Sequence, residues 1–168
     1  MKASFVRKFT EFQHIRDEDT SADAIIFLVT EKDIRALGSN QKPKTFIGIG
    51  IAGTYEFGDI LQDLKVCQTK FEDTDAKVHS GFYGQFKALK TRVESILQII
   101  LKDNSVDEIL ITGHSLGGAV SAMFGASLPS KFKGQNFRVV TFGCPKPGNS
   151  KFQEIFQKRF YSLLFIFN

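Results

Sequence analysis

The chain has 168 residues, of which 42% are hydrophobic and 24% charged. This length and composition are typical of one globular domain with a buried core, and they exclude a disordered tail or a fibre. The formal net charge of +4 comes from lysines and arginines scattered along the sequence, so nucleic-acid binding is not indicated. We expect a single domain over residues 1–168.

No targeting or membrane-spanning segment is visible in the sequence. Polar residues such as Ser4 and Thr10 interrupt any apolar core of a secretory signal. No run approaches the ~20 apolar residues of a transmembrane helix. The compartment is therefore unknown, with the cytoplasm as the default. Cys67 and Cys144 are expected to be reduced packing residues, because nothing in their spacing requires a disulfide.

The first half of the chain predicts two strands and a helix. Apolar runs at Ile25–Val29 and Thr45–Ile51 indicate neighbouring strands, whereas the stretch around His14 is polar and is expected to be exposed. Over Gln85–Lys102 the apolar residues recur at helical offsets, which predicts an amphipathic helix that Asp103-Asn104 ends.

A β-branched strand, Ile109–Thr112, runs directly into Gly113-His114-Ser115-Leu116-Gly117. Apolar residues then recur at helical spacing until Pro129, which is expected to stop the helix. A strand, a Gly-x-Ser-x-Gly turn and a helix together are typical of the nucleophile elbow of serine hydrolases. A chance match in a loop is the alternative, and the flanking elements argue against it.

Three more elements complete the predicted order. They are a strand at Arg138–Phe142, a helix whose capping box pairs Ser150 with Gln153, and a last strand at Tyr161–Phe167. Strands and helices thus alternate along the chain. This order predicts an α/β fold, a mostly parallel sheet flanked by helices.

The elbow assigns chemical roles to its residues. Ser115 is the candidate nucleophile, and Gly113 and Gly117 are small because larger side chains would collide with the neighbouring strand and helix. The N–H of Leu116 lies at a helix start, where backbone donors favour a negative charge. It is therefore a candidate donor to the oxyanion formed during ester hydrolysis.

Several separated stretches resemble the class 3 lipases, the fungal-type lipases of the α/β-hydrolase fold. The matching stretches occur in the family's order and at roughly its spacings, and they are Ile49-Gly50-Ile51-Ala52-Gly53-Thr54, Asp63-Leu64, Val78-His79-Ser80-Gly81-Phe82, the elbow, and Thr141-Phe142-Gly143-Cys144-Pro145-Lys146-Pro147-Gly148-Asn149. Ala52 departs from the pattern, since the family usually has arginine there. The N–H donor of the residue after Gly53 does not depend on that side chain.

The resemblance implies hydrolysis of a carboxylic ester of an acyl lipid, triacylglycerol or a related compound, in lipid metabolism. It implies no metal or organic cofactor, no nucleic acid, and contact with a lipid–water interface. In the family, the residue matching Thr54 gives the second oxyanion donor, that matching Asp63 supports it, and that matching His79 is structural. His114 occupies the variable position of the elbow, and its side chain is expected to point away from the nucleophile.

The same resemblance predicts that this chain lacks part of the catalytic triad. In the family, the acid and the histidine follow the serine, but here no histidine follows His114 and the only later carboxylate is Glu154, expected to be a solvated surface charge. We expect a fold that is incomplete at the C-terminus, with little or no turnover. Two classes remain open, a lipase-like ester hydrolase and a catalytically inactive lipid-binding protein or fragment.

The segment Tyr55–Leu64 has two interpretations. Its apolar residues Phe57, Ile60, Leu61 and Leu64 favour a short amphipathic lid over the pocket, with Gly53 and Gly58 as hinges. A plain connecting helix packed on the core is the alternative.

Overall fold

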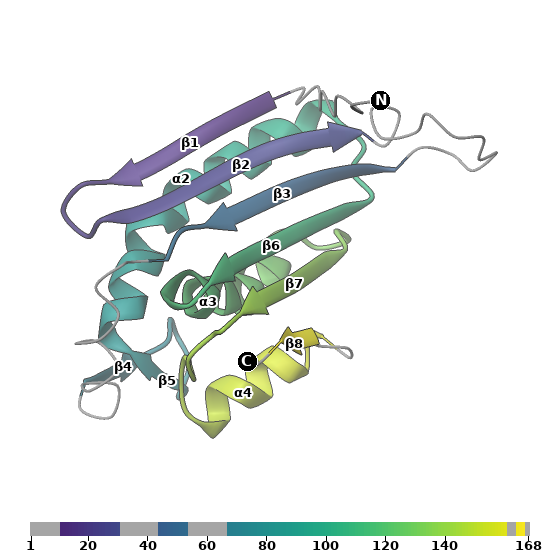
Figure 1. The fold of residues 1–168 in the computed structure, drawn as a ribbon. Coiled ribbons are helices and arrows are strands. Elements are labelled where there is room, and N and C mark those ends of the chain that lie inside the picture. The colour runs from purple at the N-terminus through teal and green to yellow at the C-terminus, as the bar shows by residue number, and fades with distance from the viewer. Residues whose placement is uncertain (1–10, 31–43, 54–66, 161–163, 167–168) are drawn as a thin grey trace, which may run out of the picture.

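The computed structural model of the protein describes residues 11–30, 44–53, 67–160 and 164–166. A six-stranded sheet in the order β1-β2-β3-β6-β7-β8 forms its centre (Figure 1). These strands are β1 (Glu11–Asp17), β2 (Ala22–Thr30), β3 (Thr45–Ile51), β6 (Glu108–His114), β7 (Phe137–Phe142) and β8 (Leu164–Ile166).

Strand direction divides the sheet into two halves. β1, β2 and β3 pair antiparallel, whereas β3, β6, β7 and β8 pair parallel. Parallel neighbours need a crossover, which α2 (Ser80–Asp103) and α3 (Leu116–Lys131) provide. The carboxyl ends of β3, β6 and β7 therefore meet at one edge of the sheet, where ligands bind in open α/β sheets.

Both long helices lie on the same side of the sheet (Figure 1). α2 packs on β1 and β2, and α3 packs on β3, β6 and β7. Alternate strand residues face these helices, so Ile47, Ile49, Ile109 and Ile111 are fully buried. α3 is buried on nearly all sides from Leu116 to Leu128, which explains its almost continuously apolar sequence.

A small second sheet lies beside the carboxyl ends of the main strands (Figure 1). It pairs β4 (Gln68–Lys70) with β5 (Lys77–His79), and Gly148 adds an antiparallel bridge to Val78. α4 (Ser150–Gln157) contacts both α3 and β5. Phenylalanines join these parts, since the ring of Phe71 packs edge-on against that of Phe152 with centroids 5.0 Å apart.

The predicted α/β fold is confirmed. The strand expected at Thr45–Ile51 has those bounds, and the strands expected at Ile25–Val29, Ile109–Thr112 and Arg138–Phe142 each lengthen by one or more residues. Of the predicted last strand, residues 164–166 are described and form β8 at the sheet edge.

One strand of the main sheet was not predicted, and one helix begins earlier than predicted. The polar stretch around His14 is exposed, as predicted, but it forms an edge strand, β1, in which Ile15 is buried, so the alternation is weak. α2 begins at Ser80 and not at Gln85, because its first turn contains glycines that dilute the apolar period. The three-residue strands β4 and β5 were not predicted at all.

Two predicted helix boundaries also differ. Pro129 does not stop α3, which continues to Lys131; a proline near the end of a helix removes a single hydrogen bond. α4 is capped by Asn149 and not by Ser150, because the Asn149 side chain accepts from the Phe152 N–H.

Within the described part of the chain, no helix combines the length and apolar character needed to cross a bilayer. Both cysteines are free thiols; Cys144 is partly buried, as expected for a packing residue, whereas Cys67 is exposed.

Candidate active site

Ser115 stands between β6 and α3 in a backbone conformation that few non-glycine residues adopt. Its φ is 56° and its ψ is −122°. Its N–H donates to the Phe142 carbonyl at 2.8 Å, and its own carbonyl accepts from Gly118 and Ala119 at 3.0 and 3.3 Å. The strained turn is therefore held both by β7 and by the first turn of α3.

The glycines on either side of Ser115 have no room for a side chain. A Cβ at Gly113 would lie 2.4 Å from the Gly117 carbonyl group, and one at Gly117 would lie 2.3 Å from the Ile51 oxygen. Backbone atoms cannot move out of the way as a side-chain tip can. The elbow thus requires glycine at both positions, as the sequence predicted.

The Ser115 hydroxyl is buried and has no hydrogen bond to any residue that the structure describes. The residue is 6% exposed, and its Oγ has no partner among the described residues. Gly53 lies beside it, since a Cβ there would be 3.7 Å from the Ser115 Cβ. Leu116 is the first residue of α3, where N–H groups have no acceptor within the helix. Thr54 and Asp63 lie outside the described residues, as does the candidate lid at 55–64.

His79 occupies the N-cap of α2 and is 9% exposed. Its ring packs on that of Phe82, with centroids 4.5 Å apart, and its N–H donates to the Pro147 carbonyl at 3.1 Å. The Nδ1 atom of the ring has no hydrogen-bond partner among the described residues.

Glu154 is exposed, as predicted, and His114 is exposed as well. His114 is the last residue of β6, and a Cβ at Gly143 would lie 3.4 Å from its Nε2. The His14 side chain, half exposed on β1, pairs instead with Asp23 at 2.8 Å.

The segment from Phe142, the last residue of β7, to Asn149 is here called the site loop, and its first residues lie against the elbow. Gly143 takes a φ of 53°, and the Cβ of Cys144 lies 3.0 Å from the place where Gly118 would carry one. Burial raises the pKa of the Cys144 thiol to about 11, against the opposing effect of a hydrogen bond to Thr141. This thiol therefore stays protonated, and it is not a competing nucleophile at neutral pH.

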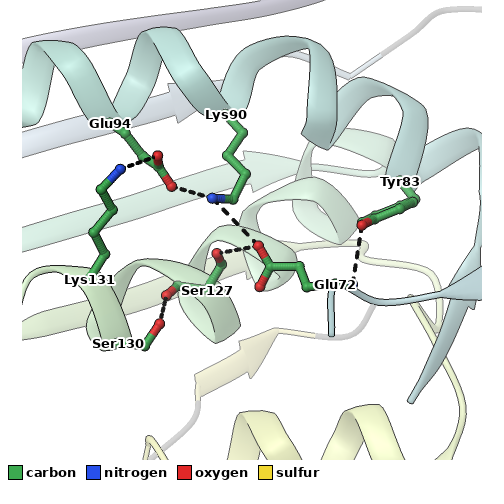
Figure 2. Close-up of polar contacts among 7 residues, drawn as sticks. All are labelled: Glu72, Tyr83, Lys90, Glu94, Ser127, Ser130 and Lys131. Atoms are coloured by element: carbon green, nitrogen blue, oxygen red, sulfur yellow. Dashed lines mark hydrogen bonds and ion pairs between the residues drawn. The ribbon is translucent and has the colours of Figure 1, made fainter. Parts of the chain in front are cut away.

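A polar cluster joins α2, α3 and the turn after β4 (Figure 2). Glu94, 7% exposed, pairs with Lys90 and with Lys131. Glu72 lies 3.5 Å from the Lys90 ammonium, accepts from Ser127 at 2.9 Å, and donates its N–H to the Tyr83 oxygen at 3.1 Å. Sequence reasoning missed this cluster, because its members are far apart in the chain.

Among the described residues, no group of histidine, cysteine and carboxylate side chains is placed to hold a metal ion. The candidate reactive group at the elbow is the hydroxyl of Ser115, which lies at a strand-to-helix turn.

A mixed sheet whose parallel half contains a strand that ends in a Gly-x-Ser-x-Gly turn is typical of the α/β-hydrolase fold. The family model for class 3 lipases matches residues 48–168, and the chain belongs to that family.

Among curated proteins, the chain is 28% identical over 117 residues to a lipase of Rhizopus niveus, covering 67% of this chain and 30% of that protein. It is 32% identical over 75 residues to the secreted mono- and diacylglycerol lipase 1 of Fusarium solani, covering 45% of this chain and 22% of that lipase. The chain thus spans about a third or less of the length of these relatives.

Solved structures show the same fold. Lipase II from Rhizopus niveus superposes with a TM-score of 0.72 at 20% identity, over 88% of this chain and 52% of that one. The lipase of Rhizopus microsporus var. chinensis superposes with a TM-score of 0.69 at 23% identity, over 90% and 51%.

Proposed function

We propose that this chain carries the nucleophile region of a carboxylic ester hydrolase that acts on an acyl lipid, with Ser115 as the nucleophile. The observation that supports this most is a buried Ser115 Oγ without a partner among the described residues, on a residue with a φ of 56°. A strained residue and an unsatisfied hydroxyl cost stability, so their joint occurrence at one position favours a chemical role.

The N–H groups of Leu116 and Thr54 are proposed as the oxyanion donors. Leu116 begins α3, whose N-terminus favours negative charge. Thr54 follows Gly53, which lies beside Ser115. We assign Asp63 the support of Thr54, and His79 a structural role beside the site, in which its ring packs on Phe82.

The substrate class is inferred from relatives. One structurally similar protein is a triacylglycerol lipase whose catalytic centre is a serine protease triad. A model for interfacial activation in lipases comes from another similar structure, a fungal lipase–inhibitor complex. We therefore propose that the substrate is a triacylglycerol or a related acyl ester, met at a lipid–water interface.

We expect the 168-residue chain by itself to turn over little or no ester. A general base must come within hydrogen-bond reach of the nucleophile, and the described residues bring none to Ser115 Oγ. Binding and oxyanion donors alone leave on the order of 10³ to 10⁴ over the reaction in water. Hydrolysis of a short-chain nitrophenyl ester that disappears in Ser115→Ala would contradict this expectation.

The nucleophile itself is tested by prolonged incubation with a fluorophosphonate probe, followed by peptide mass spectrometry. We expect a slow adduct on Ser115, absent in Ser115→Ala. Ser121→Ala is the matched control, because Ser121 lies on α3 with a buried Oγ that also has no partner among the described residues. It should be labelled as the wild type is. A folded chain in which Ser115 stays unlabelled would overturn the assignment and favour the lipid-binding alternative.

A further inference from the structure

The site loop, residues 142–149, touches the candidate site at both of its ends. Near its start, the Phe142 carbonyl accepts the Ser115 N–H at 2.8 Å. Near its end, the Pro147 carbonyl accepts the His79 N–H at 3.1 Å. One short segment thus fixes the backbone of the proposed nucleophile and that of the buried histidine.

Asn149 anchors the end of this loop through three hydrogen bonds. Its side-chain Oδ1 accepts from the Lys77 N–H and from the Phe152 N–H, each at 3.1 Å. Its own N–H donates to the Lys77 carbonyl at 2.8 Å. The same oxygen therefore caps α4 and ties the loop to β5.

Two prolines restrict the backbone of the loop between its two ends. These are Pro145 and Pro147, and Gly143 holds a φ of 53° that other residues rarely adopt. Next to Asn149, Gly148 bridges to Val78 within the small sheet. Without the Asn149 side chain, the Pro147 carbonyl loses a fixed point two residues away, while the Phe142 carbonyl keeps its anchor at the end of β7 but loses the restraint from the far end of the loop.

We propose that Asn149 is a positioning residue for Ser115 and His79, acting through the site loop. The effect of Asn149 on catalysis rests on the proposed function. Its effect on the backbone of Ser115 and His79 does not depend on that function. Asn149 contacts neither the nucleophile nor the histidine directly. It sets the position of the carbonyls that hold their backbone N–H groups.

The hydrogen bonds of Asn149 indicate which substitution should preserve its positioning role. Both side-chain hydrogen bonds are accepted by oxygen, so Asn149→Asp retains an acceptor of the same reach and remains a good N-cap. Asn149→Ala removes both bonds. Asn104→Ala is the matched control, because Asn104 is also an asparagine cap, at the far end of α2, where its Nδ2 donates to the Ile100 carbonyl at 2.9 Å.

The first measurement is amide hydrogen exchange, which needs no activity. In Asn149→Ala we expect the protection of the Ser115 and His79 N–H groups to fall roughly tenfold, while Ile111 in β6 is unchanged. Asn149→Asp should restore protection, and Asn104→Ala should leave both amides as in the wild type. Equal loss at Ile111 would mean general destabilisation, and no loss at Ser115 would overturn the proposal.

The second measurement is the rate of fluorophosphonate labelling at Ser115, at a temperature where every variant is folded. We expect a decrease of roughly 10- to 100-fold in Asn149→Ala, as for a small misplacement of a reacting group, and recovery in Asn149→Asp. Normal labelling in Asn149→Ala would contradict the positioning role. If the wild type is not labelled at all, the proposed function fails, and the exchange measurement still decides the role of Asn149.

Discussion

The elbow and the polar cluster between α2 and α3 handle buried polar groups in opposite ways. At the elbow, Ser115 Oγ and the neighbouring Ser121 Oγ have no hydrogen-bond partner among the described residues. In the cluster, both carboxylate oxygens of Glu94 are paired with lysines (Figure 2).

This contrast separates a region whose buried polar groups are paired from one that we propose is kept for chemistry. A fully paired cluster holds two helices together, since leaving any member unpaired would be costly. A buried hydroxyl without a partner among the described residues costs free energy, and we propose that Ser115 bears this cost for its chemical role. The four predictions below test this difference, from the largest effect to the smallest.

Gly117→Ala should reduce the free energy of unfolding by about 3 kcal/mol, because its Cβ would lie 2.3 Å from the Ile51 oxygen. Gly84→Ala is the control: no atom lies within 4 Å of its Cβ, and it is inside α2, so it should stabilise by about 0.5–1 kcal/mol. Urea denaturation measures both. Equal stability of Gly117→Ala and wild type would show that the elbow is not tightly packed.

Glu94→Gln should cost about 2 kcal/mol, since it weakens two charge-assisted hydrogen bonds to a carboxylate that is 7% exposed. Glu108→Gln is matched to it, because Glu108 pairs with Arg138 at the surface, and we expect a loss of less than about 1 kcal/mol. Urea denaturation of both variants measures the difference. If both substitutions lower the free energy of unfolding equally, the polar cluster stabilises the protein no more than a surface ion pair does.

The stabilisation from Glu94 should disappear in acid. Burial raises the pKa of Glu94, but the hydrogen bonds from Lys131 and Lys90 outweigh it and hold the pKa below the ordinary 4.5. A lowered folded-state pKa contributes stability above the unfolded value, which is lost as the pH falls through the folded one. The stability difference between wild type and Glu94→Gln should be constant at neutral pH and shrink below about pH 4.5. A pH-independent difference would contradict this linkage.

Ser115→Gly should stabilise the protein by about 1 kcal/mol relative to Ser115→Ala, because glycine accepts a φ of 56° without strain. Thermal unfolding of the two variants gives the difference. The opposite order would mean that the elbow conformation is not strained.

Local patterns predicted the elements that carry the nucleophile. An apolar strand and a glycine-flanked turn can be recognised from neighbouring residues alone. This is why the sequence predicted the strand at Thr45–Ile51 and the strand and turn from Ile109 to Ser115. β1 escaped notice because its polar residues lie at a sheet edge, where one strand face is solvated.

Contacts between distant residues could not be predicted from patterns. Glu72 meets Ser127, and Asn149 meets Lys77, only after the sheet has brought α3 and the small hairpin together. Ser150 and Gln153 satisfied the rule for a capping box, but Asn149, one residue earlier, is the better acceptor for the Phe152 N–H. The capping-box rule thus predicted α4 correctly but assigned its N-cap to the wrong residue.

The change of strand direction at β3 leads us to expect an order of folding. β1 and β2 are joined by a short turn, so their hairpin closes a small loop and is expected to form early. Pairing β3 with β6 brings Phe46 to Glu108, and this distant contact has to wait for α2 to cross over. Ser115 lies just beyond that late pairing, and we expect the elbow to be among the last parts of the chain to reach its native geometry.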